Sequence, residues 1–216
     1  MKKTFILILL LVFGISVSAE AELIGGVEFP DGENSFADAV VNYSRGGGVS
    51  NQNADPSTAL GVPDYPNGTA GEKGCVPLGY YGSITLQFTN NALTTSGNDA
   101  LDLWIFEAGV IEPQAVSIST DGSSWIDVGQ VGGATSGIDI DQFAGVVVGE
   151  SYSYVRIKDL GGTTSYPTAG ADIDAVGAIS SAPPVNPVPE PSTILLMGLG
   201  LLGLAGYSRK RFAKKS

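Results

Sequence analysis

Short stretches of alternating or continuous apolar residues, each bounded by turn-forming residues, recur along most of this chain. Long segments with helical periodicity are absent between the two ends, so the pattern favours strands joined by turns. Thirty glycines and twelve prolines supply those turns. Eight strands are predicted, at Val40–Tyr43, Ser83–Phe88, Leu101–Phe106, Ala115–Ser119, Trp125–Val128, Val146–Val148, Tyr152–Lys158 and Ile173–Ile179.

Two of these segments indicate the fold class. Ser83–Phe88 alternates between apolar and polar residues, as a strand with one buried face does. Leu101–Phe106 is apolar on nearly both faces, which is typical of a central strand in a sandwich. We therefore predict an all-β, antiparallel β-sandwich, with a jelly roll favoured over an immunoglobulin-like topology. Gly61–Gly82 is rich in glycine and proline and is predicted to be one long surface loop.

The N-terminal segment, residues 1–21, has the pattern of a secretory signal peptide. Lys2 and Lys3 precede the apolar run Phe5 to Phe13, and Val17-Ser18-Ala19 forms a small-residue cleavage site. The apolar run is expected to be helical. A retained membrane anchor is the alternative, but this run is shorter than the roughly 20 residues that a spanning helix needs.

The C-terminal segment combines a linker, an apolar stretch and a basic tail. Residues 181–188 are proline-rich and predict an extended linker. Residues 193–207 are apolar and predict a short membrane helix, and residues 208–216 are basic. Because positive charge beside an apolar segment stays on the cytoplasmic side, we expect the inner membrane to hold this end transiently, with the domain outside.

Pro189-Glu190-Pro191 comes directly before this apolar stretch and basic tail. The order of the three features closely resembles the PEP-CTERM sorting signal of Gram-negative bacteria, and the resemblance covers residues 189–216. It implies processing by an exosortase, a membrane-embedded enzyme, and delivery to the cell surface or the extracellular matrix. Proteins of this kind typically come from bacteria that make exopolysaccharide. A plain tail anchor is the alternative.

Residues 22–180 form one predicted domain between these two ends. Between residues 22 and 188, four basic residues stand against twenty acidic ones, which gives a net charge of −16. Such a surface repels nucleic acid, which we exclude as a partner, and suits cations or neutral partners.

The chain has no histidine and a single cysteine, Cys75. This composition excludes Ser-His-Asp catalysis, histidine-bound zinc and thiolate clusters. Cys75 is expected to be a small, half-buried apolar residue. An intermolecular disulfide or a lipid attachment is the alternative for this side chain.

Several segments resemble discoidin-type, galactose-binding-like jelly rolls of bacterial cell surfaces. The hairpin VSISTDGSSWIDVG (Val116–Gly129) has their S-x-DG-x-x-W pattern, and further matching pieces cover most of Phe36 to Ile179. The resemblance implies an eight-stranded jelly roll, often calcium-stabilised and often glycan-binding. The chain departs from it at Ala59-Leu60-Gly61, where a discoidin-type module has an Asp-Gly-Asn segment.

Five carboxylates are candidate ligands of a structural calcium ion. Asp172 and Asp174 are two residues apart on a predicted strand, so they share a face at a spacing of roughly 7 Å. Asp102 and Glu107 flank the central strand, and Asp38 precedes the first strand. If the jelly roll brings its first and last strands together, these residues can supply several of the six to eight oxygens that Ca²⁺ accepts.

Two alternatives remain for the acidic pair Asp172 and Asp174. Arg156 and Lys158 share a strand face and are expected, in the first alternative, to neutralise the pair through salt bridges. In the second alternative, both carboxylates are simply solvated.

Aromatic side chains in turn-rich segments are candidates for stacking on sugar rings: Tyr65, Tyr80, Tyr81 and Tyr166. Packing of the loops is an equally supported role for them. Trp104 and Trp125 are assigned to the core.

The sequence therefore predicts an exported, non-catalytic protein of the cell surface or extracellular matrix, with polysaccharide binding and structural calcium as further expectations. A purely structural matrix protein without a small ligand is the first alternative. A secreted carbohydrate-active enzyme is the second, and would need two carboxyl groups about 5.5 Å apart in a cleft for a retaining mechanism.

Overall fold

The computed structural model describes residues 21–65, 74–133, 135–162 and 165–182. The strands are β1 (Glu22–Ile24), β2 (Val27–Phe29), β3 (Ala39–Ser44), β4 (Val76–Pro77), β5 (Ser83–Gln87), β6 (Ala92–Leu93), β7 (Leu103–Glu107), β8 (Gln114–Ser119), β9 (Ile126–Val131), β10 (Thr135–Ile138), β11 (Tyr154–Asp159), β12 (Asp172–Ala178) and β13 (Ser181–Ala182). The 3₁₀ helices are η1 (Gly32–Ser35), η2 (Asn51–Asn53), η3 (Pro56–Ala59) and η4 (Ile140–Gln142). In these ranges, no helix has the length and apolar character needed to cross a membrane.

Several predicted segments lie outside the described residues. They are residues 1–20 of the signal peptide, residues 183–188 of the linker, the Pro189-Glu190-Pro191 motif, the apolar stretch 193–207 and the basic tail. The first two residues of the predicted linker form β13, which pairs with β6.

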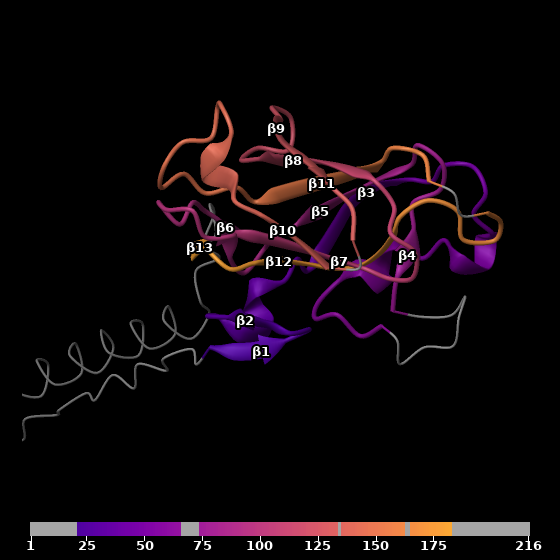
Figure 1. Ribbon diagram of the computed structural model, residues 1–216, viewed down its shortest axis with the longest axis horizontal. Coiled ribbons are helices and arrows are strands. Elements are labelled where there is room, and N and C mark those ends of the chain that lie inside the picture. Colours follow the sequence, from indigo (N-terminus) through magenta and orange to yellow (C-terminus); the bar gives the residue numbers. More distant parts are fainter. Residues whose placement is uncertain (1–20, 66–73, 134, 163–164, 183–216) are drawn as a thin grey trace, which may run out of the picture.

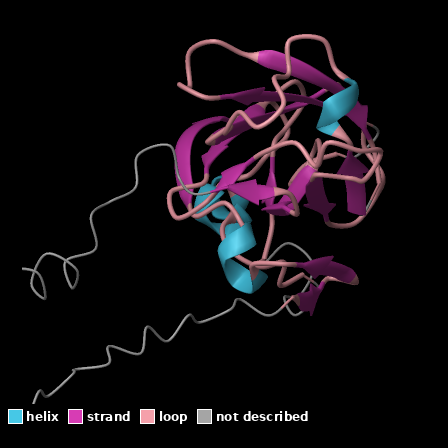
Figure 2. Ribbon diagram, turned by 90° about the vertical axis from the view of Figure 1, so that its left-hand side faces the viewer, coloured by secondary structure: helices cyan, strands magenta, loops and turns pink. Residues whose placement is uncertain are grey.

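Two antiparallel sheets form the body of the domain, one above the other (Figure 1, Figure 2). One sheet has the strand order β3-β5-β11-β8-β9 and the other the order β10-β7-β12-β4. Their pairing is nested: β4 pairs with β12, β5 with β11, β7 with β10, and β8 with β9. Leaving out β6, eight strands run from β4 to β12. The first of them pairs with the last, the second with the seventh, the third with the sixth and the fourth with the fifth. This nesting is the wrapping of a jelly roll, so the predicted all-β antiparallel sandwich is confirmed.

The core lies between the two sheets and follows the alternation of the strands. In β5, Ile84 and Leu86 are fully buried, whereas Ser83 and Gln87 lie on the outer face. Each buried side chain of this size stabilises the fold by about 1.5–3 kcal/mol relative to an exposed one. The predicted alternation is therefore confirmed at these four positions, whereas Thr85, on the outer face, is 7% exposed and also buried.

Strand β7 is covered on both faces, as the apolar sequence LDLWIF predicts. Leu103 and Ile105 join the main core, while Trp104 and Phe106 pack into a second cluster on the other side of the sheet. The hairpin β1–β2 lies against this outer face and supplies Phe29 to the second cluster (Figure 1). Trp104 is half-buried and packs against this second cluster, so the prediction that it belongs to a hydrophobic core is confirmed.

Trp125 is not part of either hydrophobic cluster among the described residues, so its assignment to the core is wrong. It is half-buried, and the Arg156 side chain lies over its ring. The amphipathic indole tolerates this position because one of its faces is covered while its edge remains near water.

The prediction of a strand at Val146–Val148 is also wrong. Val146 and Val147 have no regular secondary structure and Val148 lies in a turn, and Val147 and Val148 are 57% and 77% exposed. Gly145 and Gly149 on either side have φ angles of +97° and +78°, which bend the chain where a strand would run straight. The strand in this part of the chain is β10, whose sequence TSGI is too short and polar to produce a clear pattern.

Gly61–Gly82 is not one surface loop. It contains β4, whose Val76 is fully buried and whose pairing with Asp172 and Ile173 adds an edge to the four-stranded sheet. Strand β4 has only two residues, between Cys75 and Leu78. A strand this short shows no periodicity, so the sequence pattern does not predict it.

Candidate functional site

Three connections meet at the end of the sandwich that carries most of the candidate tyrosines. The backbone of Gly47 pairs with Tyr80, and that of Val49 pairs with Thr168. Tyr80 and Tyr81 are 38% and 70% exposed, but their rings pack against glycines of the neighbouring connections, Gly48 and Gly161. These contacts favour loop packing as their role.

Tyr166 and Tyr65 have different surroundings. Tyr166 belongs to the same loop end and is 71% exposed, with its neighbour Pro167 accepting a hydrogen bond from the Ser50 amide. Tyr65 is positioned instead by β12, because its amide donates to Asp174 Oδ2 at 3.4 Å. The four tyrosines therefore do not form one aromatic platform, and sugar stacking by any of them stays a prediction.

Asp159 organises this loop end, although the sequence pattern did not single it out. It is fully buried at the end of β11, and its carboxylate accepts the amides of Tyr81 at 2.9 Å, Gly161 at 2.8 Å and Ala171 at 3.0 Å. Tyr81 has a φ angle of +60°, which is unusual for a residue with a side chain. The carboxylate holds this strained turn in place.

The five carboxylates predicted as one calcium site lie in separate places. Asp38 accepts the amide and hydroxyl of Thr89 at 3.0 and 2.8 Å. Asp102 precedes β7 and Glu107 ends it, which separates them by about 16 Å along an extended strand. Asp172 and Asp174 are at the β4 edge of the sheet. No single ion can contact all five side chains.

Glu107 and Asp172 do come together, next to Glu112. Asp172 lies beside the strand end that Glu107 occupies, since the Ala108 amide donates to the Asp172 carbonyl at 2.8 Å. Glu107 is 5% exposed and Glu112 1% exposed. Glu107 Oε1 and Asp172 Oδ1 are buried without a hydrogen-bond partner. Burial raises the pKa of Glu107 to about 8 and that of Asp172 to about 7, with the Glu112 charge adding to both shifts.

Asp174 has different neighbours, although it is only two residues from Asp172. Its carboxylate accepts the amides of Asp64 and Tyr65 at 3.1 and 3.4 Å. Burial nevertheless raises the pKa of Asp174 to about 7. The prediction of salt bridges from Arg156 and Lys158 to the acidic pair is wrong. Both cations lie on the other sheet, and the pKa values of Asp172 and Asp174 are raised, whereas a paired cation would lower them.

These raised pKa values predict the pH dependence of stability. Between about pH 4 and pH 8 the folded protein binds more protons than the unfolded chain, so its free energy of unfolding falls as the pH rises. We expect a loss of at least about 2 kcal/mol from about pH 5 to about pH 8, measured by urea denaturation. Glu107→Gln is expected to flatten this dependence and to stabilise the protein at about pH 8. A profile that rises with pH over this range would contradict the assignment.

Cys75 is half-buried, as predicted. Burial, aided by the charges of Asp172, Asp174 and Asp64, raises the pKa of its thiol to about 12. Since the thiolate is the reactive form, this cysteine is unreactive near neutral pH.

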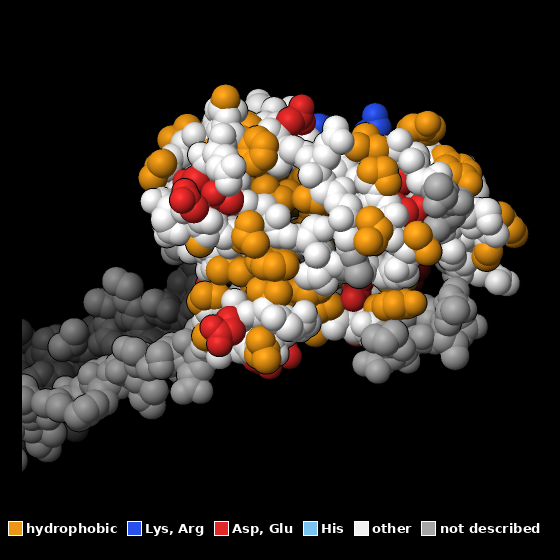
Figure 3. All heavy atoms as spheres, in the orientation of Figure 1, with side chains coloured by type: hydrophobic (Ala, Val, Ile, Leu, Met, Phe, Trp, Pro, Cys, Tyr) orange, Lys and Arg blue, Asp and Glu red, His pale blue; other side chains and the backbone are white. Residues whose placement is uncertain are grey.

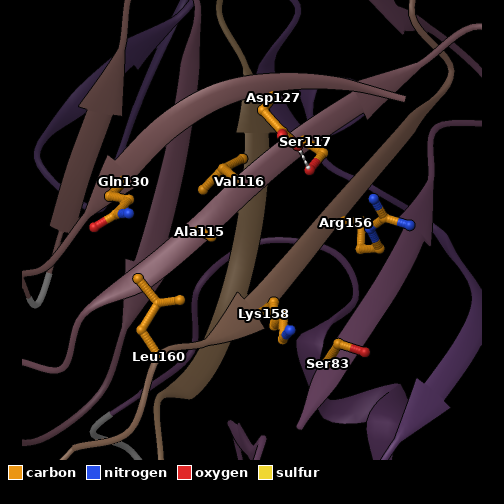
Figure 4. A pocket seen from close by; sticks show the side chains of 9 residues that line it. All are labelled: Ser83, Ala115, Val116, Ser117, Asp127, Gln130, Arg156, Lys158 and Leu160. Atoms are coloured by element: carbon orange, nitrogen blue, oxygen red, sulfur yellow. Dashed lines mark hydrogen bonds between the residues drawn. The ribbon is translucent and has the colours of Figure 1, made fainter. Parts of the chain in front are cut away.

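A groove of about 590 Å³ lies on the outer face of the five-stranded sheet (Figure 4). Its size is within the usual range of ligand sites, roughly 300–1,000 Å³. The residues that line it come from β5, β8, β9 and β11 and the chain after β11: Ser83, Ala115, Val116, Ser117, Asp127, Gln130, Arg156, Lys158 and Leu160.

The strand register places the two cations of this groove side by side on β11. Arg156 lies between Thr85 of β5 and Ser117 of β8, and Lys158 lies between Ser83 and Ala115. Figure 4 shows both basic side chains on the same face as Gln130 and Leu160. The guanidinium carbon of Arg156 is 4.2 Å from the centroid of the Trp125 ring. The indole thus supports the guanidinium from one side.

The turn between β8 and β9 explains the Asp-Gly hairpin motif. Asp121 Oδ1 accepts the amides of Ser123 and Ser124, both at 2.8 Å, and the Ser119 hydroxyl accepts the Gly122 amide at 2.9 Å. These bonds hold the pKa of Asp121 well below its usual range. The motif residues shape the turn that presents Trp125 to Arg156.

Comparisons with known proteins identify the C-terminal signal. Residues 187–211 match the family described as the PEP-CTERM protein-sorting motif, and this range includes Pro189, Glu190 and Pro191. A search of curated proteins found no match. The chain is similar to a solved structure, the C-terminal domain of a chitobiase from Bacteroides fragilis, at 13% sequence identity and a TM-score of 0.37, covering 68% of this chain and 93% of that one. Because this motif marks membrane-anchored precursors that an exosortase-type enzyme processes, the chain is an exported protein of the cell surface or extracellular matrix.

Proposed function

We propose that this exported domain is non-catalytic and binds an acidic polysaccharide of the extracellular matrix in the groove between β5, β8, β9 and β11. The observation that carries the proposal is the position of the cations. Of the three basic residues in the described ranges, Arg156 and Lys158 line this groove, and Arg45 lies elsewhere.

The charge distribution favours an anionic ligand at this one place. The net charge of −16 between residues 22 and 188 disfavours a polyanion elsewhere on the domain, whereas Arg156 and Lys158 give the groove positive charge. On the face shown in Figure 3, the visible Lys and Arg side chains lie at the upper margin, where the five-stranded sheet lies in Figure 1. A guanidinium held over the Trp125 ring has donors for two parallel hydrogen bonds to a sugar carboxylate.

The other groove residues suit a sugar ring. Gln130, Ser83 and Asp127 offer donors and acceptors for ring hydroxyls, and Leu160 and Ala115 offer apolar surface for a ring face. Asp127 is the one carboxylate in the groove lining and accepts the Ser117 hydroxyl at 2.7 Å. A paired acid and base, which glycoside hydrolysis requires, is thus missing from the residues that line it, which supports a binding role.

The proposal predicts that Arg156→Gln with Lys158→Gln weakens binding to a polyuronate by at least about tenfold, which corresponds to about 1.4 kcal/mol. Affinity electrophoresis of the protein in gels containing polygalacturonate measures this change. Arg45→Gln is the matched control, because it removes the third cation of the described ranges from an exposed site where it bonds Asn51. Raising the ionic strength from about 0.05 to about 0.5 M is expected to weaken binding as well.

Two results would contradict this function. If the protein is not retarded by polyuronate at low salt, a structural matrix protein without a glycan ligand is the better description. If Arg45→Gln weakens binding as much as the double variant does, the groove is not the site.

A further inference from the structure

Asp102, Asp139 and Asp141 lie together at the end of the sandwich opposite the tyrosine loops. Asp102 directly precedes β7, and Asp139 directly follows β10, the strand that pairs with β7. Asp141 belongs to η4. One carboxylate oxygen from each of the three residues lies within 4.8 Å of those from the other two.

This arrangement has a buried oxygen that no protein group satisfies. Asp102 is fully buried; its Oδ2 accepts the Ile140 amide at 3.0 Å, and its Oδ1 has no hydrogen-bond partner. A buried acceptor without a partner is costly and calls for an explanation.

The basic residues of the described ranges do not neutralise this cluster. Arg156 and Lys158 occupy the groove on the other sheet, and Arg45 bonds Asn51. Asp139 is 4% exposed, and its carboxylate accepts the Asp141 amide at 3.0 Å and the Gln142 side-chain amide at 2.6 Å, which are neutral donors that leave its negative charge in place. Three carboxylates at this spacing repel one another unless protons or a cation compensate them.

The spacing fits one cation. Calcium binds oxygen ligands at about 2.3–2.6 Å, so two ligands of the same ion are at most about 5 Å apart. The three oxygens meet this condition. Oxygen donors alone select a hard cation, and calcium accepts a more flexible ligand geometry than the strict octahedron of magnesium.

We propose that Asp102, Asp139 and Asp141 form a calcium site that ties two connections of the sandwich together. Asp141 Oδ2 already accepts the Ser96 hydroxyl at 3.0 Å and the Gly97 amide at 2.9 Å. Calcium there fixes the connection between β6 and β7 to η4. The site shares only Asp102 with the set expected from the sequence and is independent of the proposed glycan groove.

Thermal denaturation of the full chain in detergent, with calcium or with EDTA, tests the site. We expect about 1 mM calcium to raise the melting temperature by roughly 5 °C over EDTA. Asp141→Asn is expected to abolish this rise and to melt in EDTA at or above the temperature of the unchanged protein, because it removes repulsion. Asp102→Asn is expected to do the same. Asp127→Asn, a carboxylate of the groove, is the matched control and is expected to keep the full response.

Calorimetric titration with calcium chloride gives an independent readout, with one bound ion expected per chain. The proposal is overturned if calcium neither releases heat nor changes melting. It is also overturned if the same response occurs with magnesium or sodium at equal ionic strength, or if Asp141→Asn responds to calcium as the unchanged protein does.

Discussion

Asp159→Ala is expected to lower the free energy of unfolding by about 3–5 kcal/mol, which is a large share of the roughly 5–15 kcal/mol of a typical domain. The substitution leaves the amides of Tyr81, Gly161 and Ala171 without their acceptor. Each buried, unpaired donor costs about 1–3 kcal/mol. Urea denaturation followed by tryptophan fluorescence measures the loss.

The matched control for this prediction is Asp159→Asn. The amide side chain has nearly the same shape and keeps one oxygen acceptor, so we expect a smaller loss, of about 1–2 kcal/mol. If the alanine variant is as stable as the asparagine variant, the carboxylate does not organise the loop end as we describe.

Replacing Pro189, Glu190 and Pro191 together by alanine is expected to abolish processing at the C-terminus. The altered protein keeps its apolar stretch and basic tail, so we expect it to accumulate in the membrane as an unprocessed precursor. Cell fractionation and intact-mass measurement in the native host distinguish the precursor from the mature form, which is expected to be missing from the surface fraction.

Alanine at Pro183 and Pro184 is the matched control for the motif. These residues lie in the predicted linker and outside the matched range 187–211, and the control is expected to be processed normally. Normal release of the motif variant would show that export and sorting use another signal.

The sequence predicts the sandwich because two of its strands carry strong patterns. Ser83–Phe88 predicts a core face of Ile84, Leu86 and Phe88, Leu101–Phe106 predicts burial on both faces, and both predictions agree with the structure. Strands of two to four residues, such as β4 and β10, are too short for periodicity to appear. Their pairing comes from the nested wrapping of the whole chain, which no local pattern records.

The candidate sites are less predictable, because each depends on which strands become neighbours. Arg156 and Lys158 share a face, as expected, but β11 lies in the middle of the sheet opposite to that of Asp172 and Asp174. The sequence Asp-Ile-Asp occurs twice, at 139–141 and at 172–174, and only the second copy coincides with a predicted strand.

The copy at 139–141 is the one whose carboxylates converge with Asp102. Its role follows from the pairing of β10 with β7, and β10 was not predicted. Asp159 has no local signature either, because two of the three amides that donate to it, those of Tyr81 and Ala171, are distant in the sequence.

Nuclear magnetic resonance with the isotope-labelled mature protein and a short oligouronate tests the central claim most directly. The account predicts that the largest shifts of the backbone amide signals occur at Arg156, Lys158 and Gln130, on the outer face of the five-stranded sheet. The largest shifts at Tyr80, Tyr81 and Tyr166, or no shifts at all at low salt, would contradict it.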